Sequence, residues 1–153
     1  MKNIRKILFV CTGNSCRSIM AEAYINKLSA EQDILLEARS AGTLGIEGAS
    51  PSKEVIELLL KEGIDPSGYW SKGLSKEMIE WADLILVMAP EHKLAVLGLV
   101  PGAEKKVRYL GEFDPDRGEI MIPDPIGRPM AFYKASFIVI KRSIEELVKW
   151  LEK

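Results

Sequence analysis

The stretch ILFVCTGNSCRS, residues 7–18, decides the fold of this chain. Its first four residues form an uninterrupted apolar run, which is typical of a strand covered on both faces of a sheet. Apolar residues then recur at helical spacing, at Ile19, Met20, Ala23, Tyr24 and Leu28. Residues 11–18 therefore form a loop from a strand to a helix. The backbone N–H groups of such a loop, with the positive end of the helix, point at any anion above the strand.

Cys11 and Arg17 give this loop a nucleophile and an anion clamp. The field of the helix N-terminus favours the thiolate of Cys11, which is the form that attacks. Arg17 carries a planar fork of donors that matches phosphate oxygens. Gly13 and Asn14 are residue types that readily adopt the left-handed backbone of a tight anion cradle. We interpret residues 11–18 as a phosphate-binding loop with its own nucleophile.

Two alternatives describe the same loop. One is a buried cysteine at the end of a strand, followed by a helix-capping turn. The other is an ATP-type P-loop, which the sequence excludes because no Gly-Lys-Ser/Thr follows. The chain has only two cysteines, Cys11 and Cys16, and one histidine, so we expect neither a disulfide framework nor a zinc site. No metal and no cofactor are expected.

The composition is typical of a soluble globular protein. The chain has 153 residues, of which 47% are hydrophobic and 28% charged, and this length suffices to bury a core. A net charge of -1 argues against nucleic acid as the main partner. No apolar run approaches the ~20 residues that cross a bilayer, and none near the N-terminus suits a signal peptide. We expect one domain over residues 1–153, no membrane partner, and a cytoplasmic location, where a thiolate stays reduced.

Strand and helix patterns alternate along the chain. Strands are predicted near 6–11, 34–39, 83–88 and 106–109, and helices near 17–29, 51–62, 75–81 and 129–151. This alternation predicts a single three-layer α/β domain, with a four-stranded parallel sheet and helices on both faces. Ser50-Pro51 and Ser75 are expected to cap the second and third helices. In parallel sheets ligands bind beyond the carboxyl ends of the strands, where Cys11 lies.

The segment CTGNSCRSIMAEA, residues 11–23, resembles the active-site loop of the low-molecular-weight protein tyrosine phosphatases. That family includes bacterial protein arginine phosphatases and one class of arsenate reductase. The similarity continues through residues 39–42 and 82–88 to Asp124-Pro125, and covers essentially the whole chain. It implies a metal-free hydrolysis in two steps through a phosphocysteine, with a phosphorylated protein as substrate and inorganic phosphate as product. The phosphate-binding residues that it implies are Thr12, Gly13, Asn14, Ser15, Cys16, Arg17 and Ser18.

A phosphocysteine mechanism needs a carboxyl group that protonates the leaving group and then activates water. Asp114-Pro115 and Asp124-Pro125 compete for this role. The family's general acid occupies the Asp-Pro pair immediately before the last helix, so we predict Asp124 as the acid. Asp114 is interpreted as a turn residue. The single histidine, His92, is expected at the surface or as a helix cap.

Three residues are expected to support the loop. Ser18 is predicted to donate a hydrogen bond to Cys11 and so to favour its thiolate. Its alternative role is to form hydrogen bonds with backbone groups at the start of the helix. As the family implies, Asn14 holds the loop through hydrogen bonds, one of them to Ser40. Cys16 is predicted as a redox partner that protects Cys11 through a disulfide, its alternative role being a small apolar filler.

Three substrates are served by loops of this kind. Thioredoxin-coupled arsenate reductases share the string over residues 11–18 but need two further cysteines near the third strand, and residues 84–100 contain none. Phosphotyrosine enzymes typically carry Ile where Ser15 stands and aromatic residues after the Asp-Pro pair, where this chain has Ile126-Gly127. Arginine-specific enzymes carry Thr at the position of Ser15, whose hydroxyl can meet a guanidinium nitrogen.

The sequence therefore predicts a cysteine-dependent protein phosphatase. Phosphotyrosine is the general assignment, and phosphoarginine as the main substrate is the alternative that the pocket chemistry favours. Arsenate reduction is the weaker alternative because the relay cysteines are missing. A non-catalytic phosphate-binding module would usually have lost the nucleophile, the arginine or the acid, and all three are present.

Overall fold

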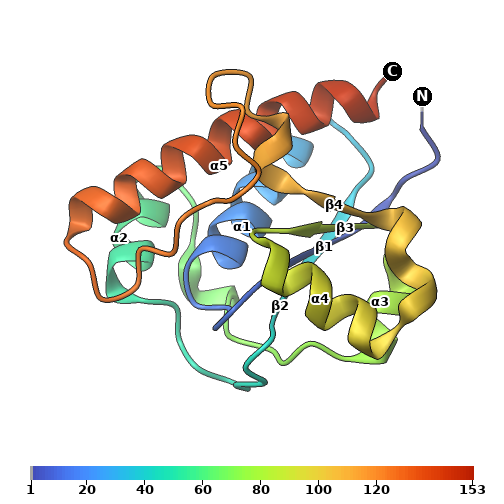
Figure 1. The fold of residues 1–153 in the computed structure, drawn as a ribbon. Coiled ribbons are helices and arrows are strands. Elements are labelled where there is room, and N and C mark those ends of the chain that lie inside the picture. The colour runs from blue at the N-terminus through green and yellow to red at the C-terminus, as the bar shows by residue number, and fades with distance from the viewer. Residues whose placement is uncertain (1) are drawn as a thin grey trace.

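The computed structural model describes residues 2–153 and is built around the predicted first strand (Figure 1). All strand pairings are parallel, and the strand order is β2-β1-β3-β4. The strands are β1 (Lys6–Cys11), β2 (Glu37–Gly42), β3 (Leu84–Val87) and β4 (Val107–Tyr109). Residues 7–10 of β1 are each 0% exposed, as expected of a strand covered on both faces.

Helices cover both faces of the sheet (Figure 1). The α-helices are α1 (Arg17–Glu31), α2 (Lys53–Lys61), α3 (Lys76–Trp81), α4 (Pro90–Leu99) and α5 (Met130–Leu151). Short 3-10 helices are η1 (Pro66–Gly68), η2 (Pro101–Lys106) and η3 (Leu110–Phe113). Within residues 2–153 no helix combines the length and the apolar character that crossing a bilayer requires.

Alternate residues of β1 serve two hydrophobic cores. Ile7 and Phe9 pack with α1, α2 and α5, whereas Leu8 and Val10 pack with α3 and α4. One face of α5 belongs to the first core, and its buried apolar residues include Tyr133, Phe137, Ile140, Ile144, Leu147 and Leu151. The predicted α/β fold with a four-stranded parallel sheet is thus confirmed.

Two local predictions need correction, and a third is confirmed. The second strand runs over residues 37–42 and not 34–39, because the apolar residues 34–36 precede the ladder and Leu35 is 79% exposed. The second helix begins at Lys53 after Ser52, which makes no side-chain capping bond, so the Ser50-Pro51 start is wrong. The prediction for Ser75 is confirmed, since its Oγ accepts from the Met78 N–H at 3.3 Å.

The sequence prediction also lacked α4. Only His92 and Val96 of this helix are buried, so its sequence carries no apolar stripe of the kind that reveals an amphipathic helix. Its start at Pro90 has a physical reason, because proline is preorganised for the first helical turn.

Gly42, the last residue of β2, lies directly against the loop that follows β1. A Cβ atom on Gly42 would lie 2.7 Å from the carbonyl oxygen of Thr12 and 2.9 Å from the backbone nitrogen of Asn14. The N–H groups of the next two residues, Thr43 and Leu44, donate to the carbonyls of Cys11 and Thr12, each at 3.0 Å. The end of β2 therefore fixes the backbone of the loop, and only glycine allows this approach.

The variant Gly42→Ala should be destabilised, because its methyl group meets backbone atoms that cannot rotate away. We expect the free energy of unfolding to fall by about 1–3 kcal/mol, as for an overpacked site, when measured by urea unfolding. Gly98→Ala is the matched control, because Gly98 lies in α4 with no atom within 4 Å of its Cβ position. The control should lose no stability, and a Gly42→Ala variant as stable as wild type would contradict the contact.

Candidate active site

A cavity of about 100 Å³ lies above the carboxyl end of β1. It brings together three parts of the chain that are far apart in sequence: the loop after β1, the segment after β2, and the segment before α5. The residues that line it are Cys11, Thr12, Gly13, Ser15, Cys16, Arg17, Leu44, Asp124 and Ile126. The predicted nucleophile, anion clamp and general acid thus share one small cavity.

Cys11 is 2% exposed and lies beneath this cavity. Its Sγ is 2.8 Å from the Oγ of Ser18. The Nδ2 group of Asn14 donates to the same Ser18 oxygen at 2.7 Å, so the hydroxyl proton of Ser18 is left to donate to the sulfur. This hydrogen bond and the N-terminus of α1, which begins at Arg17, both favour negative charge on Cys11.

Asn14 is 0% exposed and has a left-handed backbone with a φ of 53°. Its Nδ2 group also donates to Ser40 at 2.9 Å, which confirms the expected contact, and its Oδ1 accepts from the Lys72 N–H at 2.9 Å. The Oγ of Ser40 in turn donates to the Oε1 of Glu22 at 2.5 Å. A chain of buried hydrogen bonds thus leads from Glu22 to Cys11.

Sequence reasoning missed Glu22 as a member of this network. The available signal was its position in the middle of the apolar helix start, between Ala21 and Ala23. Glu22 is 8% exposed, and burial raises the pKa of its carboxyl group, although the hydrogen bond from Ser40 and the charges of Lys72 and Arg39 act in the opposite direction.

Arg17 connects the loop to the segment before α5. Its side chain is 5% exposed, and its Nη1 donates to the carbonyl of Ile122 at 2.8 Å. Its Nη2 lies 3.5 Å from the Oδ2 of Asp124 and 3.4 Å from the Oγ1 of Thr12. The carboxylate of Asp124 is 40% exposed and its Oδ1 accepts from the Ile126 N–H at 3.1 Å. Asp124 is therefore held at the rim and remains open to solvent.

Asp114, the competing candidate, does not line this cavity. Its Oδ1 accepts from the Asp116 N–H at 3.0 Å, which is the predicted turn contact. The sequence did not reveal that its side chain is also 0% exposed and accepts two hydrogen bonds from Arg142, at 3.2 and 3.1 Å. Burial works to raise the pKa of Asp114, but these hydrogen bonds outweigh it and lower the pKa.

Cys16 is the N-cap residue of α1 and is 3% exposed. Its Sγ lies 3.1 Å from the Oγ of Ser52. Burial raises the pKa of its thiol, and this effect outweighs the hydrogen bonds from Ser52 and Ser15. Cys16 is thus a neutral thiol near neutral pH, and its role as a redox partner of Cys11 stays a prediction.

The expectation that His92 lies at the surface or caps a helix is wrong. This side chain is 0% exposed, and its Nε2 lies 2.9 Å from the Oγ1 of Thr12 in the loop. The reason is the helix α4, which the sequence analysis lacked and which carries His92 in its first turn. Burial lowers the pKa of His92 to about 4, and the charge of Arg17 acts in the same direction.

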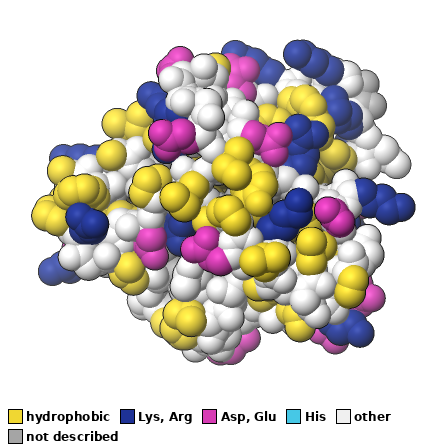
Figure 2. Space-filling view, in the orientation of Figure 1, with side chains coloured by type: hydrophobic (Ala, Val, Ile, Leu, Met, Phe, Trp, Pro, Cys, Tyr) yellow, Lys and Arg dark blue, Asp and Glu magenta, His cyan; other side chains and the backbone are white. Residues whose placement is uncertain are grey.

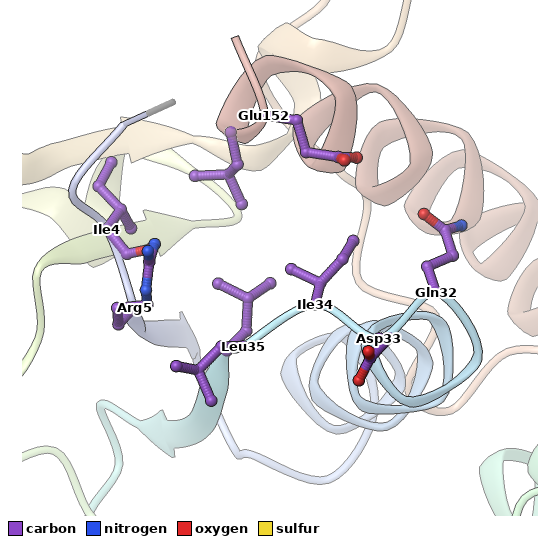
Figure 3. Close-up of a pocket in the computed structure, with 9 residues that line it drawn as sticks. Ile4, Arg5, Gln32, Asp33, Ile34, Leu35 and Glu152 are labelled. Carbon is purple, nitrogen blue, oxygen red and sulfur yellow. The ribbon is translucent and has the colours of Figure 1, made fainter.

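Cavity size and surface hydrophobicity do not by themselves identify the site. A larger cavity of about 280 Å³ lies at the amino ends of β1 and β2, lined mainly by aliphatic side chains such as Ile4, Ile34 and Leu35 (Figure 3). Hydrophobic side chains also gather in the middle of the face shown in Figure 2, among acidic and basic ones. Among residues 2–153, no three His, Cys, Asp or Glu side chains lie together where they could hold a metal ion.

Comparisons with known proteins show the family to which this chain belongs. The family model described as "Low molecular weight phosphotyrosine protein phosphatase" matches residues 6–153. A protein-arginine-phosphatase of Geobacillus stearothermophilus is 35% identical over 96% of each chain. The low molecular weight protein-tyrosine-phosphatase Ptp of Acinetobacter johnsonii is 34% identical over 95% of this chain and 96% of its own. The solved low molecular weight protein tyrosine phosphatase from T. tengcongensis is 38% identical, with a TM-score of 0.89 over 96% of this chain and 99% of its own.

Replacing Glu22 by Gln should change how stability depends on pH. Burial raises the pKa of this carboxyl above its ordinary 4.5. The protonated carboxyl therefore contributes its full stabilisation of the folded state below pH 4.5, and this stabilisation is lost as the pH rises through the raised pKa. Urea unfolding between about pH 4 and about pH 8 should therefore show wild type losing stability relative to Glu22→Gln.

Glu31→Gln is the control variant, because Glu31 is exposed at the end of the same helix. A difference between wild type and Glu22→Gln that stays constant with pH would contradict the burial of a titrating carboxyl.

Proposed function

Because the chain belongs to the low molecular weight phosphotyrosine protein phosphatase family, we propose that Cys11 forms a phosphocysteine intermediate with phosphorylated side chains of proteins. The chain is a phosphomonoester hydrolase of this family's type. The observation that carries the proposal is the convergence of Cys11, Arg17 and Asp124 on one cavity of about 100 Å³.

In the first step, the phosphoryl group binds over residues 12–18, with Arg17 and the backbone N–H groups of the loop stabilising its negative charge. The thiolate of Cys11 attacks phosphorus, so that a sulfur–phosphorus bond forms and the bond to the leaving group breaks. The protonated carboxyl of Asp124 gives its proton to the leaving group. The position of Asp124 at the rim, where its carboxyl is 40% exposed, supports this role.

In the second step, the carboxylate of Asp124 takes a proton from water, whose oxygen attacks phosphorus. The sulfur–phosphorus bond breaks, which releases inorganic phosphate and returns the thiolate of Cys11. The hydroxyl of Ser18, 2.8 Å from the sulfur, stabilises this leaving thiolate. Asn14 holds Ser18 in place through a 2.7 Å hydrogen bond, and thus acts as a positioning residue.

Phosphotyrosine is the proposed substrate class, and two features of the cavity favour phosphoarginine as a second candidate. Its walls carry aliphatic side chains, Leu44 and Ile126, which are 64% and 56% exposed. Neither can stack on a substrate ring as an aromatic wall would. Ser15 also lines the cavity and offers a hydroxyl to a guanidinium nitrogen. A reducing, cytoplasmic environment fits a thiolate nucleophile.

Cys11→Ser should abolish turnover of an aryl phosphate while phosphate binding persists, because the loop keeps its N–H groups and Arg17.

Asp124→Ala should lower kcat for substrates with poor leaving groups by roughly 10²–10⁴-fold. Steady-state kinetics measures the turnover of both variants, and calorimetry measures phosphate binding by Cys11→Ser.

Asp114→Asn is the matched control. It should keep kcat while lowering the free energy of unfolding, since Asp114 is paired with Arg142 away from the cavity. If the control loses turnover and Asp124→Ala does not, the acid has been assigned to the wrong Asp-Pro pair.

Substrate preference should depend on residue 15. We expect Ser15→Ile to reduce turnover of phosphoarginine peptides relative to phosphotyrosine peptides, because it removes the hydroxyl and narrows the cavity. Ser15→Thr keeps the hydroxyl and should retain phosphoarginine turnover. Parallel kcat/KM measurements on both peptides test this, and a ratio that is the same in wild type and both variants would remove Ser15 from substrate selection.

A further inference from the structure

The imidazole of His92 is buried against the phosphate-binding loop although it belongs to a different element. It lies in the first turn of α4, is 0% exposed, and reaches the loop through one contact, between its Nε2 and the Oγ1 of Thr12 at 2.9 Å. Its other nitrogen, Nδ1, is buried and has no hydrogen-bond partner among residues 2–153.

The unpaired Nδ1 indicates that this histidine does not serve packing alone. A buried polar atom without a partner destabilises the folded state. An apolar side chain of similar size would fill the same space without that penalty. The feature that an apolar side chain could not supply is the hydrogen bond between Nε2 and Thr12.

The contact extends from Thr12 to the anion clamp. The Nη2 of Arg17 lies 3.4 Å from the same Thr12 oxygen that faces His92. Since that oxygen accepts from Arg17, the hydroxyl proton of Thr12 is free to point at a neutral imidazole. The low pKa of His92, about 4, keeps the imidazole neutral at the pH of the cytoplasm. Thr12 thus bridges a fixed, uncharged acceptor on α4 and the guanidinium that faces the phosphate.

Among the described residues 2–153, Arg17 is otherwise held from the side of the segment before α5. Its other polar contacts are the carbonyl of Ile122 at 2.8 Å and the carboxylate of Asp124 at 3.5 Å. Both contact residues lie in the stretch 122–129, which has no regular secondary structure. The contact through Thr12 is the one that ties the guanidinium to the rigid core of the sheet and α4.

We infer that His92 is a positioning residue that orients Arg17 for oxyanion binding through the side chain of Thr12. The inference rests on the proposed function, because it assigns a part in binding the phosphoryl group. It places on α4 a residue that never touches the substrate and yet sets how strongly the loop holds the phosphoryl group.

The test compares His92→Gln with His92→Asn. A glutamine amide can occupy the place of Nε2 and reach Thr12, whereas an asparagine amide corresponds to Nδ1 and falls short. We expect His92→Asn and His92→Phe to weaken inhibition by inorganic phosphate and to lower kcat/KM for an aryl phosphate by roughly three- to tenfold, the effect of one hydrogen bond. His92→Gln should recover most of both values.

A double-mutant cycle with Thr12→Val makes the test independent of folding at position 92. Thr12→Val alone should cause the same loss, and its combination with His92→Phe should add little, because both remove one contact. Additive losses, or equal phosphate inhibition in wild type, His92→Asn and Thr12→Val, would overturn the inference. A wild-type protein that binds phosphate but does not turn over aryl phosphates would instead refute the proposed function.

Discussion

The site depends on the side chain of one buried residue, Asn14, in a strained but fully bonded position. Its backbone adopts a φ of 53°, which asparagine tolerates better than most residues. Its side chain donates to Ser18 and Ser40 and accepts from the Lys72 N–H, so its hydrogen bonds join three segments of the chain. Because these bonds lie in a buried environment, the loss of any one would leave an unpaired polar group. The loop is thus held in one shape before any phosphate arrives.

The direction of these hydrogen bonds matters as much as their number. Asn14 donates both of its amide protons, so Ser18 must turn its own proton toward Cys11, and Ser40 must turn its proton toward Glu22. The amide therefore directs one hydroxyl donor toward the sulfur of Cys11 and the other toward the carboxyl group of Glu22. No buried cation is needed beneath the sulfur, since hydroxyl and backbone donors supply the favourable field. Among residues 2–153 the one buried guanidinium is that of Arg17, and it remains available for the substrate.

Local features could be predicted from sequence, and long-range contacts could not. β1, the loop and the start of α1 follow from an apolar run, loop-forming residues and helical spacing within residues 6–29. The second strand was misplaced because its register is set by pairing with β1, not by its own apolar residues. His92 and Glu22 were missed because their burial arises from elements that are distant in sequence. The pairing of Asp114 with Arg142 spans 28 residues and leaves no local signal.

The structure separates the parts that perform the chemistry from the parts that meet the substrate. Cys11, Asn14 and Ser18 are buried in the core between a strand and a helix. The walls formed by Leu44 and Ile126 are exposed and lie in segments without regular secondary structure. Substitutions in such walls cost little stability, whereas any change beneath the sulfur disturbs a network that must be complete to work. One cradle can therefore serve different phosphorylated side chains, which explains how relatives with this fold carry the names of both tyrosine and arginine phosphatases.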